Sequence, residues 1–159
     1  DVGTISSLWE ANMEVLDPEH SGINLFDENW KIYSRNSGMT GHKIGSNAVV
    51  ENCMITDGCR IDGNVKHSIL FSGVKVEKGA KIEDAVVMGG TVIKAGAVVE
   101  HCIVAENVVI GENAIVGSMP KDEEDGVATI GSGITIGKGA KIGPNAMVNK
   151  NVEDGEEQW

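Results

Sequence analysis

Few residues in this chain have side chains that could do chemistry, and they are dispersed. Asp1 is a carboxylate followed by a glycine-containing turn and a predicted helix. Considered within this chain alone, it is an acidic residue that precedes a helix. No two histidines have the H-x3-H or H-x4-H spacing of a zinc site. The three cysteines lack paired metal spacing, so we expect free thiols in a reducing cytoplasm. The four histidines are His20, His42, His67 and His101, and the three cysteines are Cys53, Cys59 and Cys102.

The glycine-rich segment GSGITIGKGAKIG (131–143) resembles a phosphate loop only superficially. The motif G-x4-G-K-[ST] requires glycine where Ser132 stands and a hydroxyl residue where Gly139 follows Lys138. The segment also lies among predicted short strands, with no transition from strand to helix that would aim backbone amides at a phosphate. We therefore predict no nucleotide loop here.

Composition and charge limit the function classes. The net charge of -11 argues against nucleic acid or an anionic membrane as a partner, because binding either needs a basic face. No apolar run is long enough to span a bilayer, and no charged segment precedes an apolar one as in a signal peptide. We expect a cytoplasmic protein with no membrane partner.

Residues 1–42 are predicted to form one short helix and an extended arm. Thr4 or Ser7 can cap the helix, Ser7-x-x-Glu10 is a possible capping box, and Pro18 should end it. The segment Ile23–Ser34 is rich in strand-forming residues. Because the arm is too short to bury its own aromatics, we expect it to lie against something larger. Apolar residues recur at helical spacing at Ile5, Leu8, Trp9, Met13 and Leu16.

Residues 43–149 form a repeat with a period of five or six. Each unit has two small or aliphatic residues separated by one outward residue, which describes a very short strand. Glycine, asparagine and aspartate between units supply corners. The pattern predicts an all-β fold, a single-stranded parallel β-helix, although alternation alone also fits antiparallel strands. An acidic loop at 117–129 is expected to be extruded, and 150–159 form an acidic tail.

The inward pairs are Ala48/Val50, Cys53/Ile55, Cys59/Ile61, Ser68/Leu70, Val74/Val76, Ala80/Ile82, Ala85/Val87, Ala97/Val99, Cys102/Val104, Val108/Ile110, Ala114/Val116, Ile134/Ile136, Ala140/Ile142 and Ala146/Val148. The cysteines in these pairs are expected to fill the core. Val65 has no firm place in this register.

One row of outward residues is apolar. Cys53, Ser68, Ala85 and Cys102 are separated by 15, 17 and 17 residues, close to one turn each. The residues that point outward beside them should stack on one face and be too apolar to face water. We predict that this face meets the N-terminal helix and arm, another subunit, or both. Its residues are Met54, Ile69, Val86 and Ile103.

Three segments, DVGTISSLWEANMEVLD, LFDENWKIYSRN and GCRIDGNVKHSILFSGVKVEKGA, resemble the C-terminal part of bacterial glucose-1-phosphate adenylyltransferases. The resemblance covers nearly the whole chain in the family's order of helix, arm and β-helix, and it implies a left-handed coil. It also implies that D-[VT]-G-T closes a catalytic domain whose other parts are missing here. Asp1 would then be one of two catalytic carboxylates that hold Mg2+.

The resemblance further implies what the parent enzyme does. It would convert ATP and glucose 1-phosphate to ADP-glucose and pyrophosphate for glycogen synthesis, whereas this fragment alone would be inactive. The fragment would contact its own catalytic domain, build a homo- or hetero-tetramer and carry allosteric regulation. Some relatives place effector-binding arginines where this chain has Glu100 and His101, so His101 is a weak effector-site candidate and the effector is unknown.

Three alternatives stay open at this point. The chain could belong to a non-catalytic regulatory subunit of the same family, although the retained Asp1 argues against this. It could belong to a sugar-1-phosphate nucleotidyltransferase with another nucleotide or sugar. It could also be a hexapeptide acyltransferase, in which His67 or His101 would act as the general base at a subunit cleft.

Overall fold

The computed structural model describes residues 3–122 and 124–159, and its N-terminal element is the helix α1 (Ile5–Glu14). Thr4 caps this helix, because its hydroxyl accepts a hydrogen bond from the Ser7 N–H at 3.1 Å. Ser7 Oγ in turn accepts from the Thr4 N–H at 3.0 Å. The capping box therefore joins Thr4 and Ser7, and the box suggested for Ser7 and Glu10 is wrong.

A second helix, α2 (Pro18–Ser21), was not predicted. Asp17 has a non-helical backbone, as expected before proline, but Asp17 then caps a new turn in which Pro18 occupies the first position. Gly22 ends α2 with a left-handed backbone (φ 71°). Neither helix of the described chain has the length and apolarity needed to cross a bilayer.

The arm, residues 22–42, contains no strand among its assigned elements. Asparagine and aspartate side chains close local turns instead: Asn24 Oδ1 accepts from the Phe26 N–H at 2.9 Å, and Asp27 Oδ1 accepts from the Asn29 N–H at 2.8 Å. Trp30 is 76% exposed and Tyr33 is 87% exposed. Strand propensity is not realised here because the arm has no partner strand.

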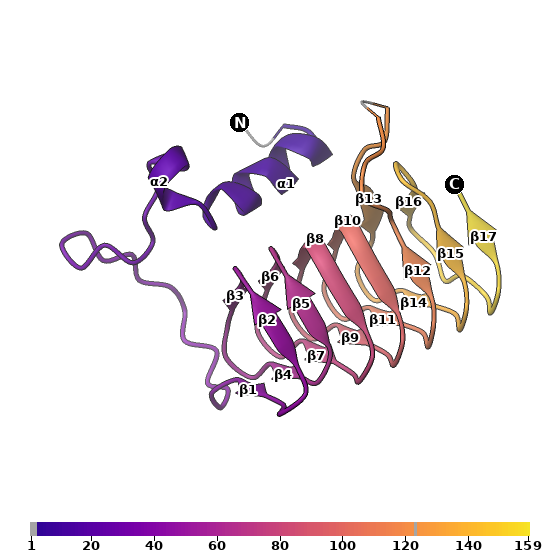
Figure 1. Ribbon diagram of the computed structural model, residues 1–159, viewed down its shortest axis with the longest axis horizontal. Coiled ribbons are helices and arrows are strands. Elements are labelled where there is room, and N and C mark those ends of the chain that lie inside the picture. The colour runs from indigo at the N-terminus through magenta and orange to yellow at the C-terminus, as the bar shows by residue number, and fades with distance from the viewer. Residues whose placement is uncertain (1–2, 123) are drawn as a thin grey trace.

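The rest of the chain winds into a prism of short strands (Figure 1). The strands are β1 (Lys43–Ile44), β2 (Val49–Glu51), β3 (Met54–Ile55), β4 (Arg60–Ile61), β5 (Asn64–Lys66), β6 (Ile69–Leu70), β7 (Lys75–Val76), β8 (Lys81–Val87), β9 (Val92–Ile93), β10 (Val98–Val104), β11 (Val109–Ile110), β12 (Ile115–Val116), β13 (Ala128–Ile130), β14 (Thr135–Ile136), β15 (Lys141–Ile142), β16 (Met147–Val148) and β17 (Glu157–Gln158).

These strands make three parallel faces. The first face has the order β1-β4-β7-β9-β11-β14. The second runs β2-β5-β8-β10-β12-β15-β17, and the third contains β3, β6, β13 and β16 together with the second halves of β8 and β10. Every pairing is parallel and joins one turn to the next, for example Val98↔Lys81 and Val98↔Ile115. The predicted all-β parallel β-helix is therefore confirmed, and antiparallel strands are excluded for the described pairs.

The interior is filled by the predicted inward residues. Cys59 and Cys102 are fully buried in this core, and Cys53 packs at its edge. Burial raises the pKa of all three thiols, which keeps them neutral. Val65, which the repeat left unplaced, is 1% exposed and pairs with Val50 and Ile82.

Two segments depart from the regular winding. Between β12 and β13 the chain leaves the prism at the edge between the second and third faces (Figure 1) and returns at Val127, which is buried. At the other end, residues 150–159, assigned to an acidic tail from the sequence, extend the coil: β17 pairs with β15, and Val152 bridges Ile136.

Candidate functional site: the corner under the N-terminal helix

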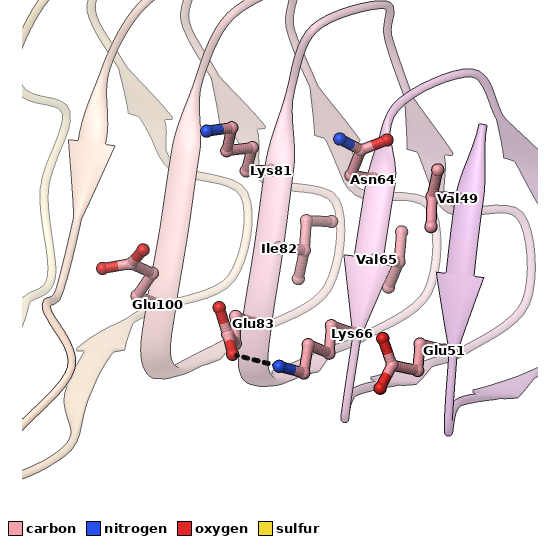
Figure 2. Close-up of a pocket in the computed structure, with 9 residues that line it drawn as sticks. All are labelled: Val49, Glu51, Asn64, Val65, Lys66, Lys81, Ile82, Glu83 and Glu100. Atoms are coloured by element: carbon pink, nitrogen blue, oxygen red, sulfur yellow. Dashed lines mark ion pairs between the residues drawn. The ribbon is translucent and has the colours of Figure 1, made fainter. Parts of the chain in front are cut away.

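The second face carries a shallow groove that Figure 2 shows in close-up. Lys66 lies between Glu51 and Glu83, and its Nζ is 3.3 Å from the Glu83 carboxylate. Glu83, with a smaller effect from Glu51, raises the pKa of Lys66. The groove has a volume of about 220 Å3, which is below the ~300–1,000 Å3 of small-molecule sites. The groove is thus smaller than a usual small-molecule site. What it presents is a row of charged side chains along one edge of the prism.

The third face is covered by α1, which lies along the β-helix (Figure 1). Ile69, Val86 and Ile103 point outward from successive turns, and they are 5%, 1% and 5% exposed. Met13 of α1 is 6% exposed and belongs to the same apolar cluster, together with Val127 where the loop returns. The residues at its margin are Ile5, Leu8, Trp9, Val15, Leu16, Met54 and Met88. Of the four residues that we singled out from the sequence, Ile69, Val86 and Ile103 thus form the floor beneath the helix, and Met54 packs at its margin.

Trp9 fixes α1 to the edge of the prism as well as to its face. Its indole Nε1 donates a hydrogen bond to the Asp84 carbonyl oxygen at 2.8 Å. The ring also contacts the imidazole of His101, with centroids 4.5 Å apart and an interplanar angle of 65°. This edge-to-face geometry is favourable for two aromatic rings. Trp9 therefore adds a directional contact to an interface that is otherwise apolar.

The edge that Trp9 contacts is a column of polar residues, one from each of four successive turns. They are Asn52, His67, Asp84 and His101, and each has a left-handed backbone, with φ of 47°, 41°, 51° and 44°. Asparagine, aspartate and histidine tolerate this conformation better than other non-glycine residues. The strand register aligns them, because Glu51↔Lys66, Lys66↔Glu83 and Glu100↔Glu83 pair immediately before the corner. We call this set the corner column.

Two members of the corner column are joined by a hydrogen bond. His67 Nδ1 contacts Asp84 Oδ1, and their side chains are 35% and 19% exposed. An imidazole oriented by a carboxylate through one nitrogen can accept or donate a proton through the other. The pair is therefore the one arrangement in this corner with acid–base capacity.

His101 has a different environment. The residue is 9% exposed. Its Nδ1 is buried, and no atom of the described residues forms a hydrogen bond with it. Burial lowers the pKa of His101, against the opposing effect of the Asp84 and Asp125 carboxylates. A neutral imidazole packed against Trp9 is a component of the interface. A role for His101 in binding an effector stays a prediction.

The residues predicted to carry chemistry are otherwise not brought together. Asp1, the predicted catalytic and metal-binding carboxylate, lies outside the described residues. Within the described part of the chain, no group of three or more His, Cys, Asp or Glu side chains could hold a metal ion. His20 instead lies in α2, where Asp17 binds its Nδ1 at 2.8 Å.

Sequence reasoning missed the corner column. His67 and His101 are far apart in the sequence, yet they lie two turns apart on one edge with Asp84 between them. The signal was present, because each of the four residues immediately precedes an inward residue of the repeat. The contact with Trp9 could not be read this way, since it joins residues 75 positions apart.

The winding and its corners define a hexapeptide-repeat β-helix domain. A family profile described as "GlmU-like, C-terminal hexapeptide" matches residues 37–137, and the chain belongs to this family.

The chain is also similar to curated proteins named glucose-1-phosphate adenylyltransferase. The proteins from Bacillus mycoides (strain KBAB4) and Bacillus cereus (strain ATCC 10987) are each 54% identical to it over 79 residues. This similarity covers 50% of the chain and 21% of each relative, so the chain matches about a fifth of the length of these proteins.

Among solved structures, the acetyltransferase domain of PglB from Neisseria gonorrhoeae FA1090 has a similar fold. The TM-score is 0.52 at 20% identity, over 75% of this chain and 54% of that one. At this identity the likeness concerns the fold alone.

Proposed function

We propose that the chain is the oligomerisation and regulatory domain of a glucose-1-phosphate adenylyltransferase, which makes ADP-glucose and pyrophosphate from ATP and glucose 1-phosphate for glycogen synthesis. The single observation that carries this proposal is the 54% identity over 79 residues to proteins of that name. The order of helix, arm and β-helix agrees with the family's C-terminal part.

In this proposal α1 is the joint between the catalytic domain and the β-helix. Its apolar face is occupied by the third face of the prism, so the catalytic domain would be held in a fixed relation to the coil. The arm is the proposed contact surface for the catalytic domain or a neighbouring subunit of a homo- or hetero-tetramer. Its exposed Phe26, Trp30 and Tyr33 are too apolar to be explained as isolated surface residues.

Asp1 has the proposed catalytic role, as one of two carboxylates that hold Mg2+. Mg2+ takes six oxygen ligands, of which one or two are usually carboxylates and the rest are waters and substrate phosphates. The second carboxylate would come from the catalytic domain. The bound cation would neutralise charge on the reacting phosphates. Within this chain, the contribution is to supply the Asp1 carboxylate a few residues ahead of α1.

The test uses the full-length protein, in which Asp1→Asn should bind ATP and glucose 1-phosphate but lose ADP-glucose synthesis. The isolated chain should show no synthesis. A near-normal rate for Asp1→Asn at saturating Mg2+ contradicts the assignment of Asp1. A wild-type full-length protein that is inactive alone but changes the rate or effector response of a catalytic partner subunit favours the non-catalytic regulatory subunit instead. Turnover with a different nucleotide or sugar 1-phosphate identifies the related transferase.

A second candidate is a hexapeptide acyltransferase, and the His67–Asp84 pair is the observation that favours it. An oriented imidazole is what a general base at a subunit cleft requires. Against it, Trp9 and α1 occupy the same edge of the prism. Release of free thiol from acetyl-CoA in the presence of amino-sugar acceptors, abolished in His67→Asn, would establish this activity; no thiol release from the wild-type chain removes the candidate.

A further inference from the structure

A groove near the C-terminal turns lies outside everything assigned so far. It has a volume of about 440 Å3 and runs between the loop that follows β12 and the indole of Trp159. This volume is within the ~300–1,000 Å3 of small-molecule sites. Its lining includes Ile115, Ser118, Lys121, Asp122, Asp125 and Lys141. The groove is therefore larger than the one on the second face, and it has an aromatic side chain in its wall.

Trp159 is held in place although 79% of it is exposed. The six-membered part of its ring lies against Gly143, where a Cβ atom would overlap with Cε3. Glu157 accepts a hydrogen bond from Lys141 Nζ at 2.7 Å. The hydrogen bond and the charge of Lys141 lower the pKa of Glu157. The Gly143 N–H also donates to the Gln158 carbonyl at 2.7 Å. An exposed indole packed against the Gly143 backbone is a preformed platform.

The charged residues of the groove balance one another. Lys121, Lys141, Asp122 and Asp125 all line it, whereas the whole chain has a net charge of -11. A phosphate-bearing ligand would meet the two carboxylates, and a cation drawn to the indole would meet the Lys121 ammonium, whereas the Lys141 ammonium is already paired with Glu157. Neither charge is favoured, so the lining is complementary to a neutral ligand.

The loop carboxylates can each serve such a ligand. Asp125 Oδ2 accepts from the Lys121 N–H at 3.0 Å, and Asp122 Oδ1 accepts from the Glu124 N–H at 3.0 Å. An ionised carboxylate has about four acceptor positions, so these bonds orient the groups without exhausting them. Asn145 fixes the base of the loop through a 2.6 Å hydrogen bond to the Glu124 carbonyl. Acceptors, ammonium donors and an apolar platform thus surround one space.

We propose that this groove binds a neutral sugar ring of an oligosaccharide. The apolar C–H face of a pyranose would stack on the Trp159 indole, and its hydroxyls would donate to Asp122 and Asp125 and accept from Lys121. Hydroxyl groups are both donors and acceptors, which suits a lining that offers both. This site is separate from the proposed nucleotidyltransferase activity and does not depend on it.

The test is calorimetric titration of the chain with maltoheptaose, xylohexaose and mannohexaose at tens of millimolar. We expect binding of at least one of them. Trp159→Ala should weaken it by at least about fivefold, which corresponds to the loss of ~1 kcal/mol of aromatic contact. Gly143→Ala should weaken binding while Trp159 is still present, because the added Cβ displaces the ring. The backbone of Gly143 is not left-handed, so alanine fits the coil.

The matched control is Trp30→Ala, which removes an indole of similar exposure (76%) from the arm and should leave binding unchanged. Circular dichroism melting separates loss of the site from loss of the fold. No binding of the three oligosaccharides, equal binding by Trp159→Ala and wild type, or preferential binding of inorganic phosphate or choline each overturns the proposal.

Discussion

Replacing Val86 by aspartate should release α1 from the β-helix while the coil stays wound. Val86 is 1% exposed and points outward from β8 into the apolar cluster with Ile69, Ile103 and Met13. Removing this side chain from the interface forfeits ~1.5–3 kcal/mol of transfer free energy, and an unpaired buried carboxylate costs more. The chain avoids the second cost by undocking the helix, which lets water reach the introduced carboxylate. The total penalty therefore cannot exceed the docking free energy of α1.

The expected weakening is at least ~2 kcal/mol, or about 30-fold in the docking equilibrium. Chymotrypsin under native conditions provides the assay, with cleavage scored by mass at Leu8 and Trp9 of α1 in chains still uncut at the exposed Phe26, Trp30 and Tyr33 of the arm. When cleavage is slow compared with redocking, the rate of cleavage follows the population of the undocked helix. It should rise by about the same 30-fold factor.

Val49→Asp is the matched control, since Val49 also points outward from a short strand but is 59% exposed. It should leave cleavage of α1 unchanged, and both variants should keep the β-sheet circular dichroism spectrum. The reasoning is refuted if Val86→Asp is as resistant to chymotrypsin as wild type, or if the control is cleaved equally fast. Loss of the β-sheet spectrum in Val86→Asp would show that this residue supports the coil itself.

Two more predictions follow from the corners. Burial lowers the pKa of His101 below its ordinary 6.5. At pH values between the lowered pKa and 6.5, the undocked state therefore binds more protons than the docked state. Acidification through this window should increase cleavage of α1, and His101→Asn should remove that pH dependence; identical profiles for the two proteins would contradict it. Asn113 has a left-handed backbone with φ 56°, so Asn113→Val should lower the free energy of unfolding by at least ~1–2 kcal/mol. Asn113→Gly should lower the free energy of unfolding, measured with urea, much less than Asn113→Val does. Equal decreases for the two variants would argue against backbone strain as the cause.

The repeat predicted the interior of the β-helix well because the alternation of inward and outward residues is local. Two residues fix each strand, and turn-forming residues fix each corner, so Ile61 or Val116 can be placed without tertiary information. Val65 was harder, since its strand lies where the spacing changes and its place is set by pairing with Val50 and Ile82.

The site was less predictable because it depends on contacts between distant segments. An apolar outward row can be recognised from Ile69 and Val86, but the partner that covers it is not encoded in the period. The contact of Trp9 with the corner column required the structure, since its bond to Asp84 and its ring contact with His101 both join segments distant in the sequence. Intersubunit use of the same face stays a prediction, as does the role of Asp1.

The position of α1 also orders events during synthesis. The helix emerges from the ribosome before the β-helix does, but the floor it needs is completed only when Val127 has been made and the turns from Met54 onward are wound. Coils of a repeat protein can form by contact with the preceding turn alone, whereas α1 must wait with its apolar stripe uncovered. Docking is then a late step that ties successive turns together, so a chain shortened before the loop would keep Ile69, Val86 and Ile103 beneath the helix but would lack the contribution of Val127.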